Sequence, residues 1–311
     1  MKAVRIEGLT KRFGDLVALD NINLEIEEGE IYGFLGPNGA GKSTAINIIC
    51  GLLKIDKGNV YVLEKEIRKD PDFTKRNIGI VPQDIAIYGD LSAYENVSFF
   101  ASLYGLKGRE LRENVEMALK FVGLDDKAKW IANKFSGGMK RRLNIACAIA
   151  HRPKIIIMDE PTVGIDPQSR NHILESVRRL NEMGSTIIYT SHYMEEVEAI
   201  CTKISIIDHG KIIAEGTKEE LKSIITDTNT TMITVGSVTN IDENKLKNIS
   251  GVRSIDIDEN VVKIISSRDV NNLDKMILYF TSNHIPIKNV ETQTPDLETV
   301  FLTLTGRKLR D

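Results

Sequence analysis

The sequence predicts an α/β fold around a mainly parallel sheet. Short apolar runs typical of buried strands occupy residues 31–35, 155–158, 186–189 and 204–207, and helical patterns lie between them. Strands that alternate with helices favour parallel pairing. A glycine-rich segment follows the first run and two acidic residues follow the second, so polar groups collect where open α/β sheets bind ligands.

Two further patterns surround this core. Residues 3–9 and 21–27 alternate apolar and polar side chains, which predicts antiparallel strands ahead of the parallel sheet. From Ser92 to about residue 150 the pattern is helical, with a capping-box sequence at 92–95 and an amphipathic stretch at 109–122. We therefore expect a helical subdomain, at about residues 84–150, inserted into the α/β core.

The composition changes near residue 217, and the last part of the chain predicts a small α+β domain. A last helix of the core is expected to begin at Thr217, followed by a polar linker at 227–231. The predicted elements after it are a strand (232–235), a helix (243–249), a hairpin (252–265, turning at 258–260), a helix (270–280), a strand (286–290) and a final helix (296–304). This β-α-β-β-α-β order suggests a ferredoxin-like unit. The predicted domains are 1–226 and 227–311.

Charge and composition exclude several classes of protein. The 44 acidic and 41 basic residues give a net charge of −3, so nothing indicates binding to nucleic acid. The three cysteines are widely spaced, which is typical of a reduced cytosolic protein without disulfides or zinc. No signal peptide is evident, and no run approaches the ~20 apolar residues that span a bilayer. A membrane function would have to come from a partner.

The glycine-rich segment GPNGAGKST is a complete phosphate loop, placed between a strand and a buried helix expected to run from residue 45 to 53. Its glycines allow backbone N–H groups to surround phosphate oxygens, and the helix directs its positive end at the same anion. Lys42 would reach the β- and γ-phosphates, and the Ser43 hydroxyl would bind Mg²⁺. The loop predicts nucleotide binding through Gly36, Pro37, Asn38, Gly39, Ala40, Gly41, Lys42, Ser43 and Thr44.

The acidic pair ends the run IIIMDEP, which is apolar on both faces like a central parallel strand. Asp159 suits the coordination of Mg²⁺, and Glu160 suits a general base that orients the attacking water. Two acids after a strand also commonly cap the next helix. After a phosphate loop, we interpret them as catalytic.

A third motif, FSGGMKRRL at residues 135–143, lies shortly before that strand. With all three motifs, the chain resembles the ATP-binding subunit of ABC transporters over roughly residues 1–220. A Ser-Gly-Gly segment alone is a common helix N-cap. The resemblance implies that Ser136, Gly137 and Gly138 meet the γ-phosphate of ATP held by the phosphate loop of an opposite subunit, so that ATP joins two subunits.

The resemblance extends to single residues, each with a structural alternative. Gln83 matches the Q-loop residue near Mg²⁺ and water, and otherwise is polar surface. His192 matches the switch histidine at the γ-phosphate; His151, His172, His209 and His284 are assigned no role. Asp166 matches the D-loop, and equally a helix N-cap before Pro167. Phe13 stands where the family stacks an aromatic ring on adenine; a buried core residue is the alternative.

Two details indicate a subclass. Phe135 and Met139 replace the more common Leu and Gln, and the run 139–142 resembles the drug-resistance (daunorubicin-resistance-like) type-2 exporters. The ending at 294–311 resembles the same class. For most of the basic residues 140–142, the alternative of a solvated helix face is favoured. Five aromatic residues between Tyr88 and Tyr104 indicate a partner interface or the core of the helical subdomain.

The resemblance implies an ATPase subunit that powers export through a separate permease by ATP-driven dimer closure, with ATP and Mg²⁺ as cofactors. Such a subunit would be cytoplasmic and peripheral on the inner face of the membrane, in a homodimer or heterodimer. The cargo stays open among drug, lipid, polysaccharide and sodium. The alternative function is a soluble ABC-class ATPase acting on ribosomes or DNA. Whether the chain is an exporter subunit or a soluble ATPase, residues 228–311 would serve as a regulatory binding module or a dimer brace.

Overall fold

The computed structural model describes residues 1–191, 193–225, 228–238, 241–267, 269–293 and 296–306. The chain forms two compact units. The first unit contains Met1–Lys218 together with the end of the chain from Thr305, and the second unit contains Glu219–Leu304. Each unit has its own cluster of buried apolar side chains.

A six-stranded sheet forms the centre of the first unit, in the order β10-β9-β3-β8-β7-β6. Five neighbouring strands pair in parallel, and β10 lies antiparallel at the edge. The strands are β3 (Ile31–Leu35), β6 (Ile78–Val81), β7 (Ile155–Asp159), β8 (Thr186–Thr190), β9 (Lys203–Asp208) and β10 (Lys211–Gly216). The predicted parallel core is confirmed, and the predicted apolar runs match these strands within one or two residues.

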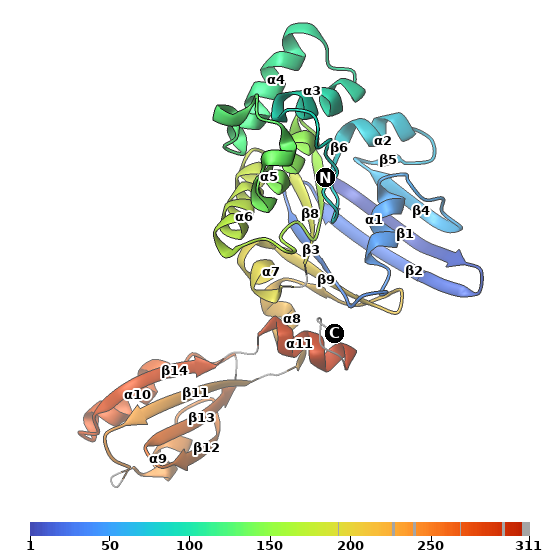
Figure 1. The fold of residues 1–311 in the computed structure, drawn as a ribbon. Helices are drawn as coiled ribbons and strands as arrows, with labels where there is room; N and C mark the ends of the chain where they lie inside the picture. Colours follow the sequence, from blue (N-terminus) through green and yellow to red (C-terminus); the bar gives the residue numbers. More distant parts are fainter. Residues whose placement is uncertain (192, 226–227, 239–240, 268, 294–295, 307–311) are drawn as a thin grey trace. The chain divides into compact units, whose positions relative to one another are not determined.

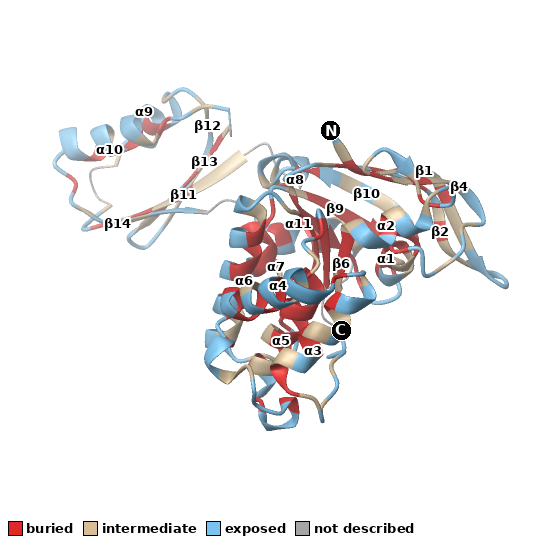
Figure 2. Ribbon diagram, turned by 90° about the horizontal axis from the view of Figure 1, so that it is seen from above, coloured by how far each residue is buried: buried red, intermediate tan, exposed pale blue. Residues whose placement is uncertain are grey.

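An antiparallel sheet of order β2-β1-β4-β5 completes this α/β body. Its strands are β1 (Lys2–Phe13), β2 (Leu16–Glu27), β4 (Lys57–Val62) and β5 (Lys65–Glu66). Helix α1 (Lys42–Ile49) contributes side chains to one cluster with buried residues of both sheets, and Figure 2 shows how burial concentrates there. The helix begins at Lys42 rather than residue 45, since the phosphate loop leads directly into its first turn.

Helices dominate the segment between β6 and β7. They are α3 (Ala93–Leu103), α4 (Gly108–Phe121) and α5 (Gly137–Ile149), which contact one another, with short 3-10 turns at Asp125–Lys127 and Ala132–Lys134. Figure 1 shows them together as the inserted subdomain. The predicted capping box is confirmed, because Ser92 Oγ accepts from Glu95 N at 3.2 Å while Glu95 Oε2 accepts from Ser92 N at 2.8 Å. The remaining helices of the first unit are α2 (Pro71–Asn77), α6 (Pro167–Glu182) and α7 (Met194–Ile200).

The second unit has a four-stranded antiparallel sheet of order β12-β13-β11-β14, which is the ferredoxin-like arrangement. Its strands are β11 (Thr228–Val235), β12 (Val252–Asp258), β13 (Val261–Ser267) and β14 (Ile287–Gln293). Its helices are α8 (Lys218–Ile225), α9 (Glu243–Lys247), α10 (Leu273–Ser282) and α11 (Leu297–Thr305). The expected hairpin with its turn at 258–260 is confirmed.

One expectation for this region is wrong. The predicted polar linker at 227–231 is mostly strand, because β11 begins at Thr228 and residues 228–231 pair with 264–267 of β13. Position 227 lies outside the described residues. Threonine is β-branched and fits a half-buried pleated surface, so a polar, Thr-rich segment forms a strand once partner strands flank it. The compact units divide between Lys218 and Glu219, at the start of α8.

Candidate functional site

A cavity of about 440 Å³ lies at the phosphate loop of the first unit. Residues from five separate segments form its wall: the β1–β2 hairpin, the loop between β3 and α1, the segment after β6, the residue that follows β7, and the turn after β9. It is lined by Phe13, Leu16, Val17, Ala18, Pro37, Asn38, Gly39, Ala40, Gly41, Lys42, Ser43, Thr44, Gln83, Glu160 and His209. The fold thus brings together most of the nucleotide-site residues predicted within one chain.

Two glycines of the loop are required by its close packing. A Cβ on Gly36 would meet the Ile207 carbonyl oxygen at 2.4 Å, and a Cβ on Gly41 would meet the Ala18 carbonyl oxygen at 2.6 Å. Gly41 also has φ of 110°, a conformation that favours glycine. Gly41 caps α1 without a side-chain hydrogen bond. The N–H groups of the first turn therefore face the cavity end without a side-chain acceptor, as an anion site requires.

The Lys42 side chain is 6% exposed and curls back on the loop. Its Nζ donates to the carbonyl oxygens of Gly36 at 2.6 Å and Pro37 at 3.2 Å. Burial lowers the pKa of Lys42, and the negative charges of Glu160 and Asp159 oppose that change. The ammonium group is thus held among neutral acceptors, where an incoming phosphate would supply the stronger charged partner.

The two acids lie at the carboxyl end of β7, tied to β8. Thr190 Oγ1 donates to Asp159 Oδ1 at 2.6 Å and accepts from Glu160 N at 2.9 Å. Glu160 is 5% exposed, and its Oε2 accepts from Gln83 Nε2 at 3.0 Å. Its φ of 47° is unusual for a residue with a side chain, and such strain clusters at functional sites. Nothing in the sequence indicated the part played by Thr190.

The wall of the cavity also includes Phe13, which is 47% exposed. The alternative of a buried core phenylalanine is therefore wrong. Lys11 Nζ lies 5.3 Å from the ring centroid. Three apolar residues after it, 16–18, also line the cavity, as does His209, to which the sequence assigned no role. These residues reach the site through the β1–β2 turn and the β9–β10 turn, a contact that no local pattern signals.

The Ser-Gly-Gly segment begins α5, as predicted. Ser136 is the N-cap, and its Oγ accepts from Met139 N at 3.3 Å. A Cβ on Gly138 would meet Ser169 Oγ at 2.2 Å, so this glycine allows α5 to pack on the start of α6, while the space around Gly137 is open. Of the described residues that line the cavity, none belongs to 136–138.

Asp166 and His192 have different outcomes. Asp166 is the N-cap of α6, because its Oδ1 accepts from Ser169 N at 2.9 Å, and this hydrogen bond lowers its pKa. The helix-start interpretation is confirmed, and the D-loop role stays a prediction. His192 lies outside the described residues.

The basic run in α5 is not a solvated face. Arg141 is only 3% exposed, and its guanidinium donates to the carbonyl oxygens of Pro82 and Gln83. Arg142 is half-buried, and its Nη1 donates to the carbonyl oxygens of Val122 at 2.9 Å and Gly123 at 3.2 Å. The expectation of solvent exposure is wrong for both, because α5 packs beside the chain segments that end β6 and α4.

A buried carboxylate that sequence reasoning missed lies behind the acids. Glu196, in α7, is 2% exposed, and its Oε2 accepts from Thr162 Oγ1 at 2.8 Å, Tyr189 OH at 2.8 Å and Ser191 Oγ at 2.7 Å. Its Oε1 lies 3.3 Å from Arg170 Nε of α6. This network joins the segment after Glu160 to β8 and α6.

The oxygen atoms beside the phosphate loop could hold a cation that is bound together with a nucleotide. Within the described ranges, no group of three His, Cys, Asp or Glu side chains could hold a metal ion. Ser43, Gln83 and Asp159 offer the hydroxyl, amide and carboxylate oxygens that Mg²⁺ binds alongside phosphates and water.

The three cysteines are free and buried. Among the helices of the described segments, none is long and apolar enough to cross a membrane.

Known proteins are similar to this chain in sequence and in fold. The family model for the ABC transporter matches residues 19–163. The linearmycin resistance ATP-binding protein of Bacillus subtilis is 44% identical over 310 residues, covering 99% of this chain and 100% of that protein. The daunorubicin/doxorubicin resistance ATP-binding protein of Streptomyces peucetius is 32% identical over 312 residues, covering 100% of this chain and 94% of that protein.

A solved structure carries the same core. The dimeric post-hydrolysis structure of an ATP-binding cassette bound to ADP and Pi is 31% identical, with a TM-score of 0.62, over 69% of this chain and 98% of that chain. Sequence and fold therefore agree with the cavity geometry: this chain belongs to the ABC transporter family, as an ATP-hydrolysing subunit that powers export.

Proposed function

We propose that this ATPase binds ATP·Mg²⁺ between itself and a second ATP-binding subunit, and thereby drives a separate membrane permease that exports a toxic, drug-like molecule. The observation that carries the proposal is the division of the site. The cavity gathers Phe13, the phosphate loop, Gln83 and Glu160, whereas Ser136–Gly138 lies elsewhere in the same chain. A nucleotide held in this cavity would meet such a helix start only from another subunit.

Within the cavity, each side chain suits one part of the nucleotide. The exposed ring of Phe13 suits stacking on adenine, and Lys42 suits the β- and γ-phosphates. Ser43, Asp159 and Gln83 would complete the coordination of Mg²⁺, which balances charge on the transferring phosphoryl group. His192 would contact the γ-phosphate.

Glu160 would orient and activate the attacking water. Its carboxylate is buried, lies beside the Gln83 amide and is anchored through its backbone N–H to Thr190, so it is held in one position. Phosphoryl transfer depends chiefly on positioning and on stabilisation of charge, and a fixed carboxylate serves the first of these. Loss of the γ-phosphate then removes the ligand shared by two subunits, which would reopen the dimer.

An apolar surface on the helical subdomain suits the permease. Tyr88 and Phe99 are 50% and 39% exposed, and their rings lie 5.1 Å apart between centroids. Leu103 on the same helix is 66% exposed. The five aromatics divide in role, since Tyr104 instead stacks on His151 at 3.5 Å. Docking there would place the subunit at the inner face of the membrane.

Affinity purification of the full chain from a detergent extract tests the partner. A co-purifying protein with several membrane-spanning helices supports the proposal, whereas ribosomes or DNA would support the soluble alternative. Sedimentation of Glu160→Gln with ATP and Mg²⁺ tests the composite site, since a dimer is expected only with nucleotide. Lys42→Ala serves as the control, because it should bind no ATP and stay monomeric.

A further inference from the structure

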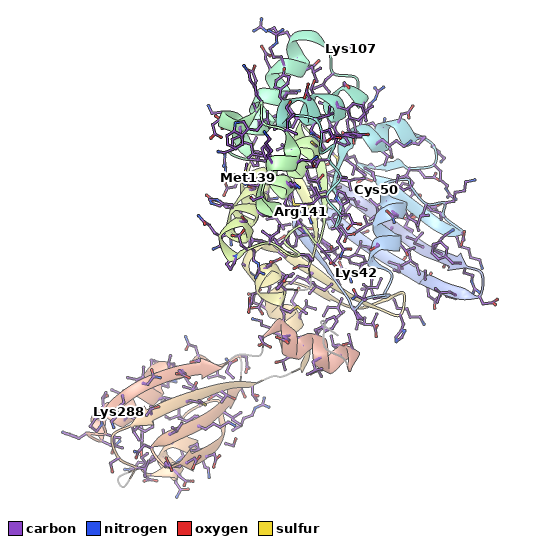
Figure 3. The ribbon with its side chains drawn as sticks, in the orientation of Figure 1. Lys42, Cys50, Lys107, Met139, Arg141 and Lys288 are labelled. Carbon is purple, nitrogen blue, oxygen red and sulfur yellow. The ribbon has the colours of Figure 1, made fainter. Side chains whose placement is uncertain are left out.

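A buried arginine links the helix that begins with Ser-Gly-Gly to the catalytic pocket of the same chain. Arg141 lies on α5, one turn after Ser136–Gly138, and Figure 3 labels its side chain. Its Nη1 donates to the Pro82 carbonyl oxygen at 2.7 Å, and its Nη2 donates to the Gln83 carbonyl oxygen at 2.6 Å. The planar guanidinium thus grips two consecutive peptide groups, a geometry that lysine cannot reproduce.

The gripped segment leads directly to Glu160. Gln83 follows β6, and its side-chain Nε2 donates to Glu160 Oε2 at 3.0 Å. Because Arg141 holds the backbone of Gln83, it also sets where the Gln83 amide meets the carboxylate. A continuous series of contacts runs from α5 through Arg141 and Gln83 to Glu160.

Burying the Arg141 guanidinium is energetically costly, and this cost makes the position of α5 depend on the position of the loop after β6. Arg141 is 3% exposed, and burial lowers its pKa while the negative charge of Asp84 opposes that change. A buried guanidinium is costly unless its N–H groups are bonded. The Pro82 and Gln83 carbonyls accept from Nη1 and Nη2 in one arrangement of the loop, while the buried Nε has no acceptor among the described residues. A movement of α5 must therefore either carry the loop along or break both hydrogen bonds.

We infer that Arg141 is a positioning residue, which couples the placement of the Ser136–Gly138 helix to the Gln83–Glu160 pair within one subunit. Engagement of α5 by nucleotide would thereby adjust the geometry for hydrolysis. This inference rests on the proposed role of Glu160. It gives the basic run after Ser-Gly-Gly a defined task, separate from contact with ATP.

The neighbouring Arg142 provides a matched control. It lies on the same helix and also donates to two backbone carbonyls, but those belong to Val122 and Gly123 at the end of α4. Its replacement by glutamine removes the same charge and the same kind of contact without touching Gln83. It should leave the kcat for ATP within about twofold of the unaltered protein, because its two acceptors lie at the end of α4 and it shares no partner with Gln83 or Glu160.

The experiment measures kcat, KM and ATP affinity for Arg141→Gln, Arg141→Lys and Arg142→Gln in the full chain. Arg141→Gln should lower kcat by roughly 10- to 100-fold, a typical range for coupling between sites, with the dissociation constant for ATP unchanged. Arg141→Lys should recover part of the loss, because lysine keeps the charge and can reach one carbonyl. In a Gln83→Ala background, Arg141→Lys should have no further effect on kcat, since the path through Gln83 is already lost.

Three results would overturn the inference: an unchanged kcat in Arg141→Lys and Arg141→Gln, an additive loss in the Gln83→Ala background, or a loss as large in Arg142→Gln. If Arg141→Gln does not fold, the lysine variant and the double variant decide alone. Normal hydrolysis by Glu160→Gln would instead contradict the proposed function, so the two failures are distinguishable.

Discussion

The two units of the molecule differ in what they bury. Among the described residues of the first unit, four charged side chains are nearly inaccessible: Lys42, Arg141, Glu160 and Glu196. In the described part of the second unit, the buried polar residues are uncharged, namely Thr231, Ser266 and Asn272. Asn272 Nδ2 donates to the Ser250 carbonyl oxygen at 2.8 Å and to Ser266 Oγ at 3.2 Å, which links the Ser250 backbone to the Ser266 side chain.

This difference separates a reactive site from a plain packed core. Burying a charge is unfavourable unless partners surround it, so buried charges mark places where structure serves another purpose than stability. Each of the four is bonded to a loop at the nucleotide cavity or to a segment that leads from it. The second unit has an apolar core of the usual kind, with Ile233, Met276 and Phe280 fully buried.

The largest expected effect concerns the charge at the reaction itself. Glu160→Gln keeps the size and the burial of the side chain but removes the base, so hydrolysis should fall by about 10²- to 10⁴-fold. ATP binding should persist, since Lys42 and the phosphate loop are unchanged. Phosphate release in a single turnover and equilibrium ATP binding would be measured together. A normal turnover would remove Glu160 from the mechanism.

The second largest expected effect comes from creating a cavity in the core of the second unit. Phe280→Ala should destabilise that unit by about 3–5 kcal/mol, because a fully buried aromatic ring leaves a void. Leu278→Ala on the same helix is the control, and its 63% exposed side chain should cost at most about 0.5 kcal/mol. Urea unfolding and limited proteolysis would measure stability, alongside ATPase activity. If Phe280→Ala lowered ATP hydrolysis as strongly as it lowered the stability of the second unit, the contrast between a catalytic first unit and a purely packed second unit would fail.

A pH-dependent effect belongs to the first unit. Burial lowers the pKa of His151 to about 4, against an ordinary value of 6.5. Below pH 6.5 the His151 imidazole is protonated in the unfolded chain but stays neutral in the folded unit. The free energy of unfolding should therefore fall as the pH drops from 6.5 towards 4. The loss is on the order of 3 kcal/mol, at 1.36 kcal/mol per unit of pKa.

Thermal unfolding across that pH window would test this effect, with His151→Phe as the matched variant, since phenylalanine has no proton to gain and keeps a ring against Tyr104. The slope of stability against pH should be shallower in the variant. An identical slope in both proteins would assign the acid sensitivity to other groups.

The smallest expected effect is at the rim of the cavity. Phe13→Ala should weaken ATP binding about fivefold, because stacking of an aromatic ring on a base contributes about 1 kcal/mol or more. Stability should hardly change, since the ring is half exposed. Phe13→Tyr should bind as the unaltered protein does. Binding of a fluorescent ATP analogue would compare the three proteins, and equal affinities would exclude stacking.

Local patterns in the sequence were enough for much of the fold and the candidate site. The phosphate loop, the acids after a buried strand, the capping box at Ser92 and the hairpin at 258–260 all lie where predicted. Each depends on residues a few positions apart, whose backbone preferences and polarity act over one turn or one strand. The strand–helix alternation likewise predicted the parallel sheet.

The tertiary structure decided what depends on residues distant in sequence. Residues 228–231 became a strand because they pair with β13, and residues 230–231 pair with β14 as well. Arg141 is buried because α5 lies beside the loop after β6. The hydrogen-bond and ion-pair partners of Glu196 come from three segments. Phe13 and His209 line the same cavity although they are nearly 200 residues apart in the sequence. The sequence does not show whether a polar side chain donates its hydrogen bond to water or to a buried carbonyl oxygen. That choice depends on how the helices and strands pack.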